Sequence, residues 1–314
     1  MAERGDHPRK CRLYVKRFRA NPILRSEMLQ LSDGDNINGP SLIRAPIWLP
    51  GRLGEYYLYF AHHRGSYIRL AFADRLEGPW TIYMPGTLHL ADIPTCRDHI
   101  ASPDVHVDWV SHKIRIYFHG PSATANSQKS FVACSSDGIK FKPHPGELGR
   151  FYMRMVPFQD AWIGMAKGGV MYRSKDGLSA FHRLPRPAFP LEDAEGNLPG
   201  SVRHVALDIV GSTLFIYFTR IGDAPECILR SQIDLNEPEE RWIATRPELV
   251  LKPERLWEGA SLPLRRSQPG MSRNPENAVR DPAVWREDGR LFLLYAVAGE
   301  TGIAISEIIE EPVA

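Results

Sequence analysis

The 314-residue sequence has few cysteines and no long apolar run, and each absence excludes a class of protein. Its four cysteines are widely spaced, so we expect reduced thiols rather than a CxxC zinc site or a disulfide scaffold. No window approaches the roughly 18 apolar residues of a membrane span. Residues 1–8 are polar and lack the apolar core of a secretory signal. The sequence therefore predicts no membrane partner and a cytoplasmic location.

An excess of one charge is also missing. Lys and Arg total 39 against 37 Asp and Glu, which leaves a formal net charge of +2. A nucleic-acid-binding protein would carry a basic stripe, so no nucleic-acid partner is expected. The one basic cluster, from Arg4 through Lys10 and Lys16 to Arg19, is predicted to be a solvated tail.

Helical periodicity is absent as well. No segment shows apolar residues at 3.6-residue spacing between helix caps, which argues against a Rossmann fold or a TIM barrel. A β-sandwich would also give many short strands. The choice between a sandwich and a propeller depends on whether the strands repeat.

A repeat of short strand, tight turn and aromatic strand does run along the chain, and aromatic and β-branched residues favour strands. The first strands of the copies are predicted at 41–48, 102–107, 155–158, 203–209 and 281–285. Their partners are predicted at 55–61, 113–119, 161–166, 214–219 and 290–296. A third strand and a Gly turn follow in most copies, as at Ser136-Asp-Gly138. Four strands per unit at such a period are typical of propeller blades.

We therefore predict an all-β protein, a single five-bladed β-propeller over residues 1–314. Its blades are four-stranded, antiparallel and arranged around a central pocket. The approximate blade limits are 38–85, 98–145, 150–185, 200–250 and 277–310. In this fold the first strand of each blade is innermost, so residues at the starts of these strands are expected to meet at the axis.

Two of these strand starts, Ser102-Pro-Asp104-Val-His106 and Arg280-Asp281-Pro-Ala-Val284, resemble glycoside hydrolase family 43, with family 117 as a relative. The resemblance implies a general-base Asp, a second Asp that orients the substrate, and a general-acid Glu from a middle blade. Asp104 stands where the orienting Asp is expected. Asp281-Pro282 resembles the base motif but lies in the last blade, and blade one reads Arg44-Ala-Pro46 with no Asp.

The general acid is missing from its expected place, since blade three reads Gln159-Asp160-Ala-Trp162. Family 117 resembles a variant of family 43 in which a histidine replaces this general-acid Glu. We therefore favour a histidine as proton donor (His63, His106, His119 or His204), with Glu300 as the alternative. A histidine donor would titrate near its ordinary pKa of about 6.5.

The candidate site residues gather near the starts of the inner strands. The catalytic candidates are Asp104, Asp281, His204 and Glu300. The substrate-binding candidates are His62, His63, Arg64, His99, His106, His119, Trp162, Arg203 and Arg280. Each also has a structural alternative: an aspartate can cap a turn, a histidine can lie in a polar turn or be satisfied in the core, an arginine can tie neighbouring blades together, and a tryptophan can belong to the core.

The resulting hypothesis is a glycoside hydrolase of carbohydrate metabolism, exo-acting and inverting on a small glycoside or oligosaccharide. No cofactor is required, and a central calcium ion is possible. A small carbohydrate is the expected ligand, and the oligomeric state is left open. The alternatives are a non-catalytic sugar-binding or regulatory propeller that has lost the acid, and a protein-interaction propeller.

Overall fold

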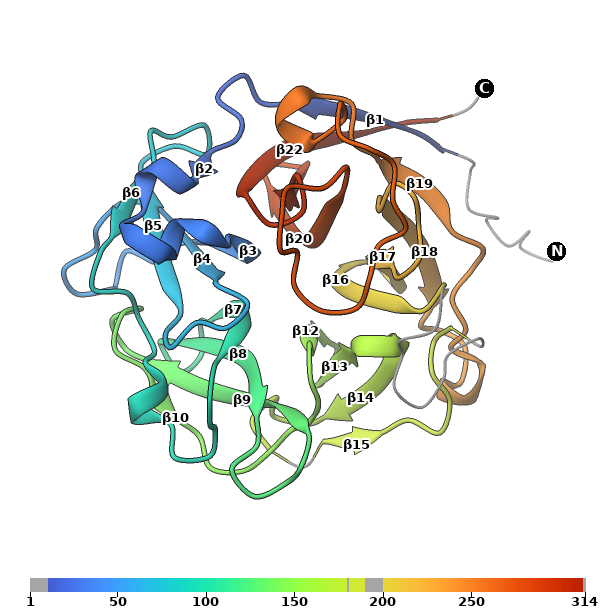
Figure 1. The fold of residues 1–314 in the computed structure, drawn as a ribbon. Coiled ribbons are helices and arrows are strands. Elements are labelled where there is room, and N and C mark those ends of the chain that lie inside the picture. Colours follow the sequence, from blue (N-terminus) through green and yellow to red (C-terminus); the bar gives the residue numbers. More distant parts are fainter. Residues whose placement is uncertain (1–10, 180, 190–199, 313–314) are drawn as a thin grey trace, which may run out of the picture.

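Five antiparallel sheets surround one axis in the computed structural model, which describes residues 11–179, 181–189 and 200–312 (Figure 1). The prediction of an all-β, five-bladed propeller is confirmed. Blade one contains β3 (Asn38–Arg44), β4 (Tyr56–Ala61), β5 (Arg69–Ala73) and β6 (Thr81–Tyr83). Blade two contains β7 (Ala101–Asp108), β8 (Lys113–Pro121), β9 (Gln128–Ser135), β10 (Lys142–Pro143) and β11 (Gly149–Arg150).

Blade three contains β12 (Arg154–Phe158), β13 (Ala161–Ala166), β14 (Val170–Ser174) and β15 (His182–Arg183). Blade four contains β16 (Val202–Val210), β17 (Thr213–Arg220), β18 (Ile228–Asp234) and β19 (Glu248–Leu251). Blade five contains β20 (Val279–Glu287), β21 (Arg290–Val297), β22 (Gly302–Pro312), β1 (Cys11–Arg17) and β2 (Leu24–Arg25). The first strands are innermost, because β3 contacts β7 and β20 while β16 contacts β12 and β20.

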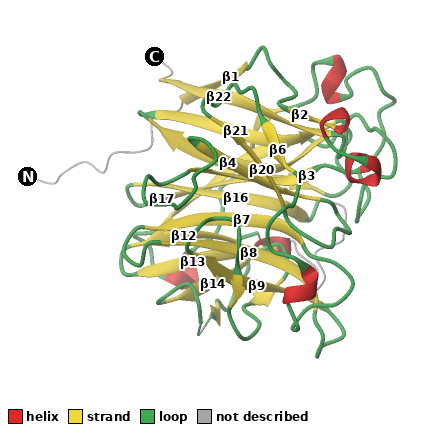
Figure 2. Ribbon diagram, turned by 90° about the vertical axis from the view of Figure 1, so that its left-hand side faces the viewer, coloured by secondary structure: helices red, strands yellow, loops and turns green. Residues whose placement is uncertain are grey.

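Short 3-10 helices interrupt the loops: η1 (Ser26–Met28), η2 (Leu31–Asp35), η3 (Leu90–Asp92), η4 (Lys167–Gly169), η5 (Glu239–Arg241) and η6 (Leu256–Glu258). In Figure 2 the helical turns next to β2 and β3 project from one side of the strands. Within the described ranges, no helix is long and apolar enough to cross a membrane.

The last blade is completed from the opposite end of the chain. Strand β1 pairs antiparallel with β22, in register from Cys11 opposite Pro312 to Arg17 opposite Ser306. The prediction of a solvated basic tail is therefore wrong in that Lys16 lies in a paired strand, but its side chain is exposed as expected, with the ammonium 3.7 Å from Glu307. Residues 4–10 lie outside the described residues. The pairing closes the ring by covering an edge that would otherwise be open.

The second strand of each blade forms the core. All residues of β4 are buried, because neighbouring strands and blades cover both of its faces. Its Tyr59 hydroxyl donates to the Gly138 carbonyl at 2.6 Å, in the turn that ends the third strand of the next blade. Tyr117 of blade two repeats this contact with Gly177 of blade three at 2.8 Å. A buried tyrosine thus ties each of these blades to its neighbour while satisfying its hydroxyl.

A bulge opens most of the inner strands. The register shifts between Asn38 and Ser41, Ala101 and Asp104, Val202 and Val205, and Arg280 and Ala283. The first bulged residue has a positive φ in three blades: Gly39 at 57°, Ser102 at 50° and Asp281 at 52°. Asp281 is therefore equivalent to Ser102, and Asp104 is equivalent to Ala283. Since a bulge re-aims side chains, the two aspartates leave their strands at different positions.

Candidate active site at the axis

A cluster of polar side chains lies where the inner strands begin. The second strand of each blade runs antiparallel to the first, so its far end reaches the same side of the propeller. We call this side the N-terminal end of the axis. The axial cluster comprises His63, His119, Tyr152, Arg203, His204, Glu226, Arg280, Asp281 and Glu300. Their strands and adjoining loops come from all five blades, so the topology brings together residues far apart in sequence.

Asp281 and His204 form the centre of the axial cluster. His204 Nε2 lies 3.2 Å from Asp281 Oδ1, and the two residues are 5% and 2% exposed. The Tyr152 ring packs edge-on against His204, with ring centroids 4.9 Å apart. The Tyr152 ring also contacts His119 at 4.2 Å between centroids. The Tyr152 ring therefore helps to fix the His204 imidazole beside the Asp281 carboxyl.

Glu300 is the second carboxyl of the cluster. Its Oε2 accepts hydrogen bonds from the amides of Asn36 and of Asn38, the latter at 3.3 Å. Arg280 Nη1 lies 3.4 Å from Oε1, and His63 Nδ1 lies 3.8 Å from Oε2. Burial opposes ionisation of Glu300, but Arg280, His63 and Asn36 outweigh it and lower the Glu300 pKa. Glu300 is therefore ionised at neutral pH.

Asp281 behaves in the opposite way. Burial, and then the negative charge of Glu300, raise the Asp281 pKa to about 7, against the opposing charges of Arg203 and Arg280. Two neighbouring carboxyls whose pKa values are driven apart are the arrangement that acid–base catalysis uses. One carboxyl retains its proton near neutral pH, and the other is an anion.

Three of the four candidate histidines, His63, His119 and His204, lie in the axial cluster and do not fit the role of proton donor expected from the sequence. Burial lowers the pKa of His204 and of His119 well below the ordinary value, and neighbouring positive charges add to this effect. Burial lowers the pKa of His63 to about 4. These imidazoles are neutral near pH 7, because desolvation and nearby cations disfavour the charged ring. They can hydrogen-bond to hydroxyl groups, but they lack the second ring proton that a general acid would donate.

Two buried arginines supply positive charge to the cluster, and both form ion pairs with Glu226. Glu226 Oε2 lies 3.2 Å from Arg203 Nη1 and 2.8 Å from Arg280 Nη2, and Glu226 is fully buried. Arg203 also donates to the carbonyls of Gln268 and Gly270, the former at 2.8 Å. Figure 1 shows the segment between η6 and β20 passing in front of blade four. This segment therefore covers one side of the cluster.

Several buried polar atoms of the axial cluster have no hydrogen-bond partner among the described residues. They are Asp281 Oδ2, His204 Nδ1, His119 Nδ1, Glu226 Oε1 and Arg280 Nε. Buried polar groups are normally satisfied, so such a concentration indicates that water or a ligand completes the network.

The remaining histidine-loop candidates lie further out. His62 is partly buried, and its Nδ1 accepts a hydrogen bond from the backbone N–H of Arg64 at 3.0 Å, which stabilises its own turn. Arg64 is exposed. His99 packs edge-on against His119 at 6.5 Å between centroids. Burial lowers the pKa of both His62 and His99.

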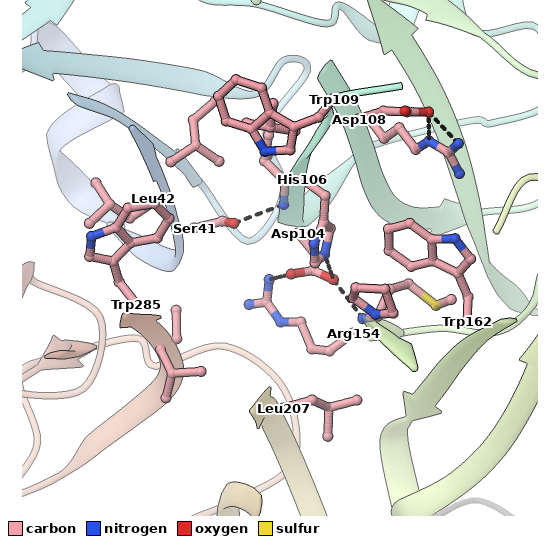
Figure 3. Close-up of a pocket in the computed structure, with 18 of the residues that line it drawn as sticks. Ser41, Leu42, Asp104, His106, Asp108, Trp109, Arg154, Trp162, Leu207 and Trp285 are labelled. Atoms are coloured by element: carbon pink, nitrogen blue, oxygen red, sulfur yellow. Dashed lines mark hydrogen bonds and ion pairs between the residues drawn. The ribbon is translucent and has the colours of Figure 1, made fainter. Parts of the chain in front are cut away.

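Asp104, His106 and Trp162 face a cavity that lies apart from the axial cluster. They line a pocket of about 800 Å³ along the later parts of the inner strands, which also includes Arg154 and Trp285 (Figure 3). Arg203, His204, Asp281 and Glu300 are not among its lining residues. The expectation that Asp104 and His106 share a pocket with Arg203 and Asp281 is thus not met, because the bulges direct the two aspartates differently.

Asp104 is fully engaged where it lies. Its Oδ2 accepts from the Met155 backbone at 2.7 Å and lies 3.0 Å from His106 Nε2, while Oδ1 lies 3.7 Å from Arg154. Burial opposes ionisation, but His106, Arg154 and the Met155 N–H lower the Asp104 pKa. Asp104 therefore positions Arg154, whose charge acts on both Asp281 and His204.

Sequence reasoning missed Tyr152, Arg154, Glu226 and the two asparagines that hold Glu300. Glu226 precedes the third strand of blade four, on the same side of the propeller as the inner-strand start. Because neighbouring strands run antiparallel, Glu226 could have been placed with the residues at the inner-strand starts. Asn36 and Asn38 directly precede the first bulge. No comparable signal marks Tyr152.

The sequence analysis allows a central calcium ion. Among residues 11–179, 181–189 and 200–312, no group of His, Cys, Asp and Glu side chains is arranged to hold a metal ion. Arg203 and Arg280 instead place positive charge beside the carboxylates. The residues present therefore do not fit a calcium site.

The fold is that of glycoside hydrolase family 43 enzymes. A putative glycosidase from Bacteroides thetaiotaomicron VPI-5482 superposes with a TM-score of 0.66 at 9% identity, covering 93% of this chain and 96% of that one. A family 43 β-xylosidase/α-arabinofuranosidase from a compost microbial metagenome has a TM-score of 0.59 at 13% identity, covering 88% and 91%. An exo-1,5-α-L-arabinanase from a bovine ruminal metagenomic library has 0.56 at 11%, covering 88% and 93%. At these identities the likeness establishes the fold.

The chain belongs to the family of the uncharacterized protein R118 of Acanthamoeba polyphaga mimivirus. The two sequences are 36% identical over 322 residues, which cover 93% of this chain and 89% of the viral protein. No family model matches the sequence.

Proposed function

We propose that the protein is a glycoside hydrolase that acts at the axial cluster, with a small carbohydrate as substrate. The observation that carries this proposal is the pairing of a protonated Asp281 with an ionised Glu300 beside buried polar atoms that have no partner among the described residues. A sugar hydroxyl both donates and accepts a hydrogen bond. It therefore suits a site that offers Arg280 Nε, Asp281 Oδ2 and Glu226 Oε1 together.

In this proposal Asp281 is the general acid and Glu300 the general base. Asp281 protonates the oxygen of the leaving group, and its raised pKa keeps the proton available near neutral pH. Glu300 removes a proton from the attacking water. Arg280 and Asn36 keep the Glu300 carboxyl ionised for this role. His204 orients the Asp281 carboxyl. The C–O bond to the leaving group breaks as the bond to water forms, so the anomeric configuration inverts.

The proposed action is on chain ends. The segment that contains Gln268 and Gly270 is bound to Arg203 and covers one side of the cluster. A polysaccharide cannot pass across a site that is closed on one side, so its end must approach instead. The enzymes of similar fold include an exo-1,5-α-L-arabinanase and a β-xylosidase/α-arabinofuranosidase. We accordingly propose that the substrate of this chain ends in a pentose.

The test is a panel of 4-nitrophenyl glycosides, including α-L-arabinofuranoside and β-D-xyloside, with the product anomer followed by proton NMR. Release of the inverted sugar, lost in Asp281→Asn and Glu300→Gln, supports the proposal. Asp288→Asn, in the β20–β21 turn, is the matched control and should retain activity. Release that is equal in all four proteins would show that the cluster is not the active site.

The low exposure of Asp281 and His204 also favours a second candidate, a sugar-binding or regulatory propeller. A closed polar cluster can recognise hydroxyl groups without cleaving a bond. Sugar binding in calorimetry, with no cleavage of any glycoside on the panel, would favour this candidate over the hydrolase.

A further inference from the structure

A cavity lies at the other end of the axis from the axial cluster. The tryptophan pocket, defined by Asp104, His106, Trp109, Trp162 and Trp285 with their neighbours, has a volume of about 800 Å³. It is lined by later residues of the inner strands, such as Leu207 of β16 and Trp285 of β20 (Figure 3). This volume is within the roughly 300–1,000 Å³ of small-molecule sites.

The floor of the tryptophan pocket separates it from the axial cluster. Arg154 is 7% exposed and lines the pocket, while its charge lowers the pKa of His204 and opposes the rise in the Asp281 pKa. Its guanidinium is held by the Pro103 carbonyl and by Asp104. A ligand in the pocket therefore contacts the opposite side of Arg154 from the proposed catalytic carboxyls.

Most charges that line the pocket are paired, and Lys175 and Asp176 add one charge of each sign. Asp104 faces both Arg154 and His106. Asp108 forms a salt bridge with Arg115 at 2.5 Å, and Arg44 lies 3.4 Å from Glu55 and from Glu287. A strongly charged ligand would have to compete with these pairs. The pocket is consequently suited to a neutral ligand.

Aromatic rings stand on separate sides of the pocket. Figure 3 shows Trp109, Trp162 and Trp285 around Asp104, His106 and Arg154. The Trp162 ring packs edge-on against His106 at 5.5 Å and carries the Arg115 guanidinium at 5.2 Å. Trp109 is 63% exposed although it is a large apolar side chain. An exposed tryptophan beside a pocket indicates a binding surface.

We propose that the tryptophan pocket is a second, non-catalytic binding site for a neutral oligosaccharide. A sugar ring has apolar C–H faces that pack on tryptophan, and its edge carries hydroxyl groups that both donate and accept hydrogen bonds. The rings of Trp109, Trp162 and Trp285 match the faces, and the polar floor of Asp104 and His106 matches the edge. The proposal does not depend on hydrolysis, because no residue of the pocket is assigned a proton transfer.

The experiment is isothermal titration calorimetry of the full chain with xylotriose, cellotriose and trigalacturonate. We expect one of the neutral trisaccharides to bind and trigalacturonate not to bind. Trp109→Ala and Trp162→Ala should weaken the binding by about tenfold or more, as for a hot-spot residue. Trp109 is mostly exposed, so its replacement leaves the fold intact. Tyr14→Ala, an exposed aromatic on the outer strand β1, is the matched control and should bind normally.

The outcomes separate this site from the proposed active site. Asp281→Asn should leave trisaccharide binding at the tryptophan pocket unchanged, whether or not the protein is a hydrolase. Loss of binding in Asp281→Asn, with normal binding in both tryptophan variants, would place the sugar at the axial cluster and overturn the proposal. Binding of the apolar dye N-phenyl-1-naphthylamine, displaced by no trisaccharide, would overturn it as well.

Discussion

Replacement of Asp281 by Asn should stabilise the protein at alkaline pH although it abolishes the proposed activity. The folded state raises the pKa of Asp281 from 3.8 to about 7, through burial and the charge of Glu300. A raised pKa in an acid means that the folded state binds a proton that the unfolded state has released. Wild-type stability therefore falls as pH rises from about 4 to about 7. Each unit of the shift corresponds to about 1.4 kcal/mol, so the fall amounts to a few kcal/mol.

An asparagine side chain cannot ionise, so the variant should lose this part of the pH dependence. We expect Asp281→Asn to be similar to wild type near pH 4 and more stable by about 2–4 kcal/mol at pH 8. Urea unfolding followed by tryptophan fluorescence at both pH values measures the difference. A variant that is equally destabilised at both values would show that the Asp281 carboxylate is ionised in the fold, and would refute the reasoning.

Asp104→Asn is the matched comparison with the opposite sign. His106, Arg154 and the Met155 N–H lower the Asp104 pKa, so its charge stabilises the fold above its unfolded pKa of about 4, and this contribution is lost as pH falls. We expect Asp104→Asn to lose about 1.5–3 kcal/mol at pH 8 and less in acid. Similar pH profiles for the two variants would contradict the assignment of the two aspartates to different environments.

Three further predictions concern the fold and the cluster. Glu226→Gln should lower the free energy of unfolding in urea by about 3–5 kcal/mol, because Arg203 and Arg280 lose a fully buried counter-charge. A loss below about 1 kcal/mol would mean that other carboxylates neutralise the two arginines. Deletion of residues 1–18 should cost on the order of 3 kcal/mol and expose the edge of β22, since Leu13 and Val15 pack against the core shared by blades four and five. An unchanged melting temperature would show that β1 does not close the ring. EDTA should leave the proposed glycosidase activity unchanged, because Arg203 and Arg280 supply the positive charge beside the carboxylates. Activity lost in EDTA and restored by calcium would require a metal site.

The fold was predictable because each blade repeats the same local pattern. The aromatic second strands and the Asp-Gly turns recur, and the structure connects them through Tyr59 with Gly138 and Tyr117 with Gly177. Strand β1 was not predictable in the same way. Its partner β22 lies at the far end of the chain, and the short alternation around Leu13 and Val15 does not indicate which strand it pairs with.

The candidate site was predictable in its location and less so in its chemistry. The prediction that residues at the inner-strand starts meet at the axis holds for Arg203, His204, Arg280 and Asp281. The separation of Asp104 from Asp281 could not be predicted, since it depends on the bulges in the two inner strands. Asp281 precedes its proline and is the first bulged residue, whereas Asp104 follows its proline and lies after the bulge. The pKa values depend on burial and on several charges together, so the neutral histidines could not be predicted from sequence alone.

The most direct test of the central claim compares Asp281→Asn with wild type on glycosides with different leaving groups. The proposed mechanism assigns the proton of the leaving group to Asp281, and a good leaving group needs no proton. We predict that the variant loses about 10²–10⁴-fold in kcat on an alkyl or natural glycoside and far less on the 2,4-dinitrophenyl glycoside of the same sugar. An equal loss on both substrates, or full activity on the natural glycoside, would show that Asp281 is not the general acid.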